Sequence, residues 1–268
     1  MLLDTHCHLD AAEFDLDREA VIARAQQAKL HALVIPAVHV DNFQKVRELA
    51  HSFDQGFYAL GIHPMYVQHA QEQDLKTLRT ELTRYWDDPK LVAIGEIGLD
   101  FFIPEISQGL PRLKQEQFYA AQLELAREFD LPVLLHVRRS QDVLLKYLRR
   151  LRVKGGLAHA FNGSLQQARQ FVELGFALGV GGAMTYSRAL QIRRLVTELP
   201  LEALVLETDA PDIPPAWLLD HRRNEPCQVA AIADALAALR GESLQQVLDG
   251  TAKTALRVLP KLSGLAAA

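Results

Sequence analysis

The 268-residue chain lacks the cysteines that stabilise small secreted domains, because it contains only Cys7 and Cys227. Two cysteines cannot form a disulfide framework, so the sequence indicates a reducing compartment and we expect a cytoplasmic protein. No apolar run approaches the ~18 residues that a membrane-spanning helix needs. Asp4 interrupts the apolar start too early for a signal peptide, so we expect no membrane association.

An excess of basic residues is also missing. The chain has 29 Lys and Arg against 33 Asp and Glu, a net charge of −4, so it has no global basic surface of the kind that binds nucleic acid. Bound divalent cations would reverse the potential around a carboxylate-rich site, which keeps nucleic acid open as a substrate. The densest basic segment is Arg138–Lys154; only Arg138 and Arg139 precede the helix that we expect there, with Ser140 as its N-cap.

Short apolar runs alternate with longer segments of helical periodicity along the chain. The runs are Leu2–Asp4, Ala32–Ala37, Tyr58–Gly61, Leu91–Gly95, Pro132–His136, Gly156–His159, Ala177–Gly181 and Ala203–Glu207. The helical segments include Ala20–Leu30, Gln115–Glu128, Leu165–Leu174, Arg188–Leu199 and Pro226–Leu259, the last with a break at Gly241. Eight strands alternating with helices in about 250 residues predict an α/β fold, the (β/α)8 or TIM barrel, as a single domain over residues 1–268. A doubly wound open sheet is the alternative, but it requires no particular chemistry at eight successive strand ends.

The first predicted strand ends in Asp4-Thr5-His6-Cys7-His8. Side chains alternate along a strand, so His6 and His8 are expected to point the same way and Cys7 the other. Two imidazoles that converge from one strand end are typical of a metal site.

Metal-binding residue types also follow other predicted strands, where the catalytic groups of such barrels lie. These residues are His63, Glu96, His136, His159 and Asp209. A dense cluster of imidazoles and carboxylates requires mutual pairing or a cation, which favours a metal site.

The donor set predicts two divalent ions. His6 and His8 with Asp209 form one site, and His136 with His159 forms the other. Glu96 comes from the strand between these groups and is placed to bridge the ions with its two oxygens. Mixed imidazole and carboxylate donors suit Zn²⁺ or Mn²⁺, whereas Mg²⁺ prefers oxygen; the sequence does not decide among the three.

Seven sequence blocks, in order along nearly the whole chain, resemble the TatD family of metal-dependent hydrolases within the amidohydrolase superfamily. The blocks are Asp4-Thr5-His6-Cys7-His8-Leu9-Asp10, Gly61-Ile62-His63-Pro64, Gly95-Glu96-Ile97-Gly98-Leu99-Asp100, Leu131-Pro132-Val133 with His136, His159 with Phe161 and Gly163, Leu206-Glu207-Thr208-Asp209-Ala210-Pro211, and Arg223-Asn224-Glu225-Pro226.

The resemblance implies a TIM barrel with a two-metal centre that hydrolyses phosphodiesters of DNA or RNA, often as a 3′-to-5′ exonuclease. The residues that match the family's metal ligands are His6, His8, Glu96, His136, His159 and Asp209. Asp209 would also orient the attacking water or take its proton, and Glu96 would bridge the metals. His63 matches an additional active-site histidine, which would contact the substrate phosphate.

Several other residues are secondary candidates. Arg223 lies in the loop after the last strand and is a candidate for binding substrate phosphate. Glu207 is expected to hold a ligand histidine or an arginine, and Asp100 either to orient a ligand or to cap the following loop. Four loop aromatics are candidates for base stacking or for simple loop packing: Phe101, Phe102, Phe161 and Trp217.

Two other functions remain open. The same barrel and metals suit hydrolysis of a small ester, amide or phosphotriester, or of aminoacyl-tRNA, and the acidic net charge favours this slightly. Some relatives in the superfamily carry a carbamylated lysine at the end of the fourth strand; Glu96 stands there and favours a phosphodiesterase. A purely structural zinc site is the third possibility, but six donors without a second useful cysteine argue against it. We expect a monomer.

Overall fold

Eight parallel strands form one sheet in which each strand pairs with the next in chain order, β1 to β8. The computed structural model describes residues 1–218 and 223–267. The strands are β1 (Leu2–Asp4), β2 (Leu30–Pro36), β3 (Gly56–Leu60), β4 (Leu91–Asp100), β5 (Val133–Arg138), β6 (Gly156–Ala158), β7 (Phe176–Val180) and β8 (Leu204–Leu206).

The sheet curls so that its first and last strands meet. The backbone N–H of Thr5 donates to Leu206 O at 3.1 Å, and that of Asp209 donates to His6 O at 2.8 Å. These bonds bring the ends of β1 and β8 together, which confirms the predicted TIM barrel and excludes the doubly wound sheet.

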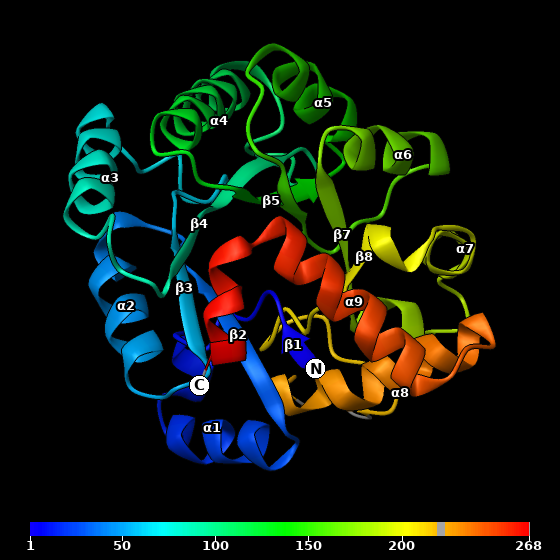
Figure 1. Cartoon of the computed structure of the whole chain (residues 1–268). Helices are drawn as coiled ribbons and strands as arrows, with labels where there is room; N and C mark the ends of the chain where they lie inside the picture. Colours follow the sequence, from blue (N-terminus) through cyan, green and yellow to red (C-terminus); the bar gives the residue numbers. More distant parts are fainter. Residues whose placement is uncertain (219–222, 268) are drawn as a thin grey trace.

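Helices between the strands form an outer ring (Figure 1). They are α1 (Arg18–Gln27), α2 (Phe43–His51), α3 (Glu72–Arg84), α4 (Gly109–Glu128), α5 (Gln141–Arg150), α6 (Leu165–Glu173) and α7 (Leu190–Glu198); two more helices, α8 (Val229–Arg240) and α9 (Leu244–Val258), follow β8. Gly241 separates the last two and has a left-handed φ of 65°, as the predicted break requires.

The barrel is closed at the end where its strands begin. In Figure 1 the red helix α9 crosses this opening beside the N terminus. Ala252, Ala255 and Val258 of α9 join the apolar cluster inside the barrel, which includes Leu3 and Val34. Since this end is filled with apolar side chains, the polar strand ends on the opposite face are left to build a site.

Two local predictions differ from the structure. Strand β4 continues to Asp100 instead of ending at Gly95, with an irregular register between Ile94 and Ile97. Glu96 therefore lies within a strand, and an irregularity of this kind re-aims a side chain. Ser140 stands at the N-cap of α5, but its hydroxyl donates to Leu99 O at 2.6 Å and does not cap the helix.

Candidate metal centre

The structure brings all the predicted donor residues together at the carboxyl ends of the strands. They come from the end of β1 (His6, His8), the end of β3 (His63), β4 (Glu96), β5 (His136), the end of β6 (His159) and the end of β8 (Asp209). Most of these side chains are buried, and His8 and His136 are half-buried.

The first donor group surrounds one oxygen of Glu96. Glu96 Oε2 lies 3.1 Å from His6 Nε2 and 3.3 Å from His8 Nε2. Asp209 Oδ1 lies 3.6 Å from each of the same two nitrogens. Asp209 has a left-handed φ of 56°, an uncommon conformation for a residue other than glycine, which is typical of functional sites.

The second donor group surrounds the other oxygen of Glu96. Glu96 Oε1 lies 3.0 Å from His136 Nδ1 and 2.9 Å from His159 Nε2. The two imidazole nitrogens are 3.4 Å apart. A single carboxylate therefore faces two separate sets of nitrogen donors.

The donor spacing fits metal ions. Ligands around a tetrahedral ion with bonds of about 2.0–2.1 Å are about 3.3 Å apart, close to the separations in both groups. The Nε2–H of His136 donates to Asp100 Oδ2 at 3.0 Å, so its Nδ1 presents a lone pair to Glu96 Oε1. Two acceptors that face each other at 3.0 Å require a cation or a proton between them.

His63 differs from the other histidines of the cluster. Its Nδ1 accepts the backbone N–H of Met65 at 3.2 Å, so the proton of the neutral ring lies on Nε2. That Nε2–H lies 3.0 Å from His136 Nδ1 and 3.3 Å from Glu96 Oε1. His63 is thus arranged as a hydrogen-bond donor at the edge of the second group, and its expected contact with a substrate phosphate stays a prediction.

The electrostatics of the cluster favour cations. Burial alone would raise the pKa of the Glu96 carboxyl, but the surrounding histidines hold it well below its usual value. Burial opposes protonation of His159, but the Glu96 and Asp209 carboxylates raise its pKa to about 10. Burial and the neighbouring His159 lower the pKa of His6 to about 3. A divalent ion that displaces the bound protons would satisfy the same carboxylates.

Comparison with known proteins identifies the family. The sequence pattern of the TatD-related DNases matches residues 3–260. The chain belongs to the TatD-related DNase family.

TatD-family relatives match over almost the whole chain. The uncharacterised metal-dependent hydrolase YjjV of Escherichia coli is 40% identical over 91% of this chain and 92% of its own length. Its crystal structure matches with a TM-score of 0.90 at 38% identity, covering 97% of this chain and 98% of that one. Human deoxyribonuclease TATDN3 is 33% identical (98% and 96% covered), and the 3′-5′ ssDNA/RNA exonuclease TatD of Klebsiella pneumoniae is 31% identical (91% and 92%). This chain is therefore a metal-dependent hydrolase.

No helix within residues 1–218 and 223–267 has both the length and the apolar character needed to cross a membrane.

The sequence analysis missed Asp4 as a contributor to this TatD-family site. Asp4 is buried and accepts hydrogen bonds from Thr208 Oγ1 at 2.6 Å, Thr208 N at 3.0 Å and His6 N at 3.3 Å. Burial raises its pKa to about 7, although the bonds from Thr208 oppose the shift. Asp4 thus fixes the end of β1 to the residue before Asp209. The sequence did contain a signal for this role, namely an acidic residue at the end of an apolar strand.

Glu207 holds the backbone next to His159, whereas the sequence predicted a contact with the side chain of a ligand histidine or an arginine. Its Oε1 accepts the backbone N–H of Ala160 at 2.6 Å and lies 3.9 Å from His159 Nδ1. Burial raises the pKa of Glu207 to about 8. A Cβ on Gly179 would lie only 2.0 Å from Glu207 Oε2, so the missing side chain at Gly179 makes room for this carboxyl.

We expect Gly179→Ala to lower metal affinity, because the methyl group would displace Glu207 and release the loop that carries His159. Loss of supporting hydrogen bonds typically reduces metal affinity by about 10–100-fold. Competition with a fluorescent chelator measures the affinity. Gly264→Ala is the matched control, because a methyl group there meets nothing within 4 Å. An equal effect of both substitutions would contradict the prediction.

Arg223 is paired with two carboxylates. Its guanidinium forms a two-pronged ion pair with Asp17, at 2.7 and 2.8 Å, and a further bond of 2.8 Å to Glu225. It also stacks 4.5 Å from the centroid of the Phe14 ring. Two carboxylates thus neutralise its charge, and the phosphate-binding role expected of Arg223 stays a prediction.

The four loop aromatics that were candidates for base stacking lie in different environments. Phe161 is buried in the apolar core, where it packs against Phe171. Trp217 is exposed, and its Nε1 donates to Gln228 at 2.8 Å. Phe101 is half-buried beneath Arg112, and Phe102 is exposed.

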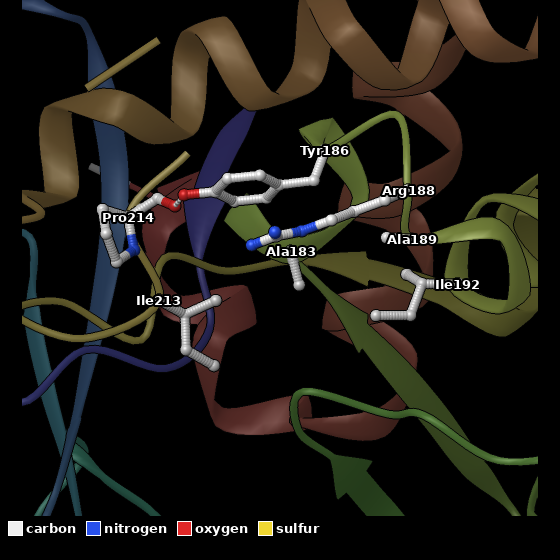
Figure 2. A pocket seen from close by; sticks show the side chains of 7 residues that line it. All are labelled: Ala183, Tyr186, Arg188, Ala189, Ile192, Ile213 and Pro214. Atoms are coloured by element: carbon white, nitrogen blue, oxygen red, sulfur yellow. Dashed lines mark hydrogen bonds between the residues drawn. The ribbon is translucent and has the colours of Figure 1, made fainter. Parts of the chain in front are cut away.

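An open pocket lies between the loops that follow β7 and β8 (Figure 2). Its volume is about 440 Å³, and its walls are Ala183, Tyr186, Arg188, Ala189, Ile192, Ile213 and Pro214. The Tyr186 hydroxyl donates to Pro214 O at 3.0 Å, and the Arg188 guanidinium lies 5.6 Å from the Tyr186 ring. Ile213 is in the loop after β8 that also carries Asp209, so this pocket shares a segment with the candidate metal centre.

Proposed function

We propose that this hydrolase is a two-metal phosphodiesterase that removes nucleotides from the 3′ end of DNA or RNA strands. The observation that carries the proposal is the position of Glu96, whose two oxygens face two separate groups of nitrogen donors. His6, His8 and Asp209 would hold one ion, and His136 with His159 the other. The exonuclease name of the Klebsiella pneumoniae relative supports the polarity.

Bound divalent ions would supply a water of lowered pKa and charge stabilisation for the phosphate. The Asp209 carboxylate, 3.6 Å from both His6 Nε2 and His8 Nε2, would orient the attacking water and accept one of its protons. The water oxygen bonds to phosphorus as the bond to the 3′ oxygen of the preceding nucleotide breaks. That oxygen then receives the proton, so a nucleoside 5′-phosphate leaves and the strand retains a 3′-hydroxyl.

His63 binds the phosphate in this proposal. Its Nδ1 is occupied by Met65 N–H, so its Nε2–H is a fixed donor at the edge of the second donor group. A donor held in place before the reaction stabilises charge that develops on a phosphate oxygen without further reorganisation.

Digestion of end-labelled oligonucleotides tests the proposed function. Chelator-treated protein is incubated with 3′-labelled and 5′-labelled single-stranded DNA and RNA, and Mg²⁺, Mn²⁺ or Zn²⁺ is added back separately. We expect metal-dependent shortening from the 3′ end. Glu96→Gln protein purified in the same way controls for contaminating nuclease, and equal digestion by the variant and the wild type would overturn the proposal.

Hydrolysis of a small ester, amide or phosphotriester is the second candidate. The open pocket of about 440 Å³ supports this candidate, because its wall includes Ile213 from the loop that carries Asp209 and could receive a small substrate beside the site. A panel of chromogenic esters, amides and phosphotriesters, assayed with the same metals, separates the two functions. Faster turnover of a panel member than of any oligonucleotide would favour this candidate.

A further inference from the structure

Two arginines converge on one exposed aromatic ring next to the candidate metal centre. Phe102 follows β4 and is 43% exposed. The guanidinium carbon of Arg138 lies 3.9 Å from the centroid of its ring, and that of Arg139 lies 4.6 Å away. We refer to Phe102, Arg138 and Arg139 as the arginine platform.

The backbone of Arg139 makes this convergence possible. Successive side chains point to opposite sides of an extended chain, and Arg138 is the last residue of β5. Arg139 instead has a left-handed φ of 56°, which is costly for a residue other than glycine. The turn in the backbone lets two consecutive guanidinium groups reach the same ring.

The charge of the platform is poorly neutralised. The acidic contact of Arg138 is Asp100 Oδ2, 3.7 Å from Arg138 Nη1. Within the described ranges, Arg139 makes neither a hydrogen bond nor an ion pair. By contrast, Arg112 also stacks on an aromatic ring but is paired with Glu116 at 3.0 Å. The platform therefore retains cationic charge on a protein whose net charge is −4.

Asp100 links the platform to the candidate metal centre. Its Oδ2 accepts the Nε2–H of His136 at 3.0 Å, and its Oδ1 accepts the backbone N–H of Phe102 at 2.8 Å. One carboxylate thus contacts both a proposed metal ligand and the segment that carries the ring. A substrate strand that leaves the metal centre on this side would meet the platform first.

We infer that the arginine platform binds a backbone phosphate of the nucleic-acid strand beyond the scissile bond. The inference rests on the proposed function and adds a preference for substrates with at least one further phosphate. Guanidinium groups suit phosphate because they donate paired hydrogen bonds, and the Phe102 ring on which both guanidinium groups lie holds them close together.

The test compares a single-stranded DNA 12-mer with bis(p-nitrophenyl) phosphate, a small diester without a second phosphate. Arg139→Asn removes the charge and tolerates the left-handed backbone, and Phe102→Leu removes the ring. We expect each variant to lower the ratio of kcat/KM for the 12-mer to that for the small diester by about tenfold, mainly through KM. Arg139→Asn should also reduce the salt dependence of 12-mer binding by about 0.7 logarithmic units per tenfold change in salt.

Two further variants sharpen the comparison. Arg149→Ala is the matched control, because it removes an arginine at the other end of α5 that is bonded to Gln170, and it should leave the ratio unchanged. Arg188→Ala tests the pocket between the β7 and β8 loops. A fall in the ratio for Arg188→Ala but not for Arg139→Asn would place the strand over that pocket and overturn the inference.

Fluorescence anisotropy of the labelled 12-mer measures binding separately from cleavage. It therefore distinguishes a failure of the proposed function from a failure of the inference about the platform. If the wild type cleaves neither substrate but Arg139→Asn still weakens 12-mer binding, the proposed function fails and the platform stands as a nucleic-acid site. If the wild type cleaves the 12-mer and the platform variants bind and cleave it as the wild type does, the inference is wrong.

Discussion

Glu96→Gln is expected to reduce the kcat of phosphodiester hydrolysis by about 1,000-fold or more and to lower the bound metal content. The substitution preserves the shape of a fully buried side chain but turns one of its two oxygens into an NH2 donor. Since each oxygen faces nitrogen donors at 2.9–3.3 Å, that NH2 group must oppose one of the two donor groups. The loss of a preorganised group that stabilises the transition state typically lowers kcat by about 100- to 1,000-fold. Here both proposed ions depend on the Glu96 carboxylate, so the loss is expected to be at least as large.

Single-turnover assays and elemental analysis of the purified protein measure the two effects. Glu81→Gln is the matched control, because Glu81 lies in α3 and pairs only loosely with Arg84 at 3.8 Å. Thermal unfolding of each variant separates loss of function from loss of fold. A Glu96→Gln protein with wild-type metal content and activity would exclude the bridging role.

Much of the fold was predictable because a barrel repeats one local pattern. The strand Leu2–Asp4 matches its prediction at both ends, and the break at Gly241 lies where it was expected. The extension of β4 to Asp100 was not predictable, because Gly95, Glu96 and Gly98 interrupt the apolar run and resemble a loop. The pairing of Leu99 and Asp100 with β5 makes this segment a strand, and that partner is remote in sequence.

The candidate site was predictable wherever a residue type and its place at a strand end carried the information. His6, His8 and Asp209 met both conditions. The role of Asp4 could not be predicted in this way, because it depends on a hydrogen bond to Thr208, which lies 204 positions away in the sequence. The same limit applies to the ion pair between Arg223 and Asp17, because the two residues are 206 positions apart in the sequence.

Asp100→Asn is expected to weaken metal binding by about 10–100-fold while leaving the thermal stability of the protein close to wild type. The asparagine carbonyl can still accept the N–H groups of Phe102 and Ile103, which Asp100 Oδ1 accepts at 2.8 and 3.2 Å. Its NH2 group, however, would face the Nε2–H of His136. To avoid two opposed donors, the imidazole must move its proton to Nδ1, and this removes the lone pair that faces Glu96.

Chelator competition gives the metal affinity of each variant, and Asp100→Ala serves as the comparison. The alanine variant loses the contacts to His136 and to the loop together, so it should reduce both affinity and melting temperature, whereas the asparagine variant should reduce affinity alone. Equal affinities for the wild type and Asp100→Asn would show that Asp100 only caps the loop. A fall in affinity without a fall in stability would instead establish that this carboxylate sets the tautomer of His136. That difference separates a residue that tunes the metal centre from one that merely holds its surroundings together.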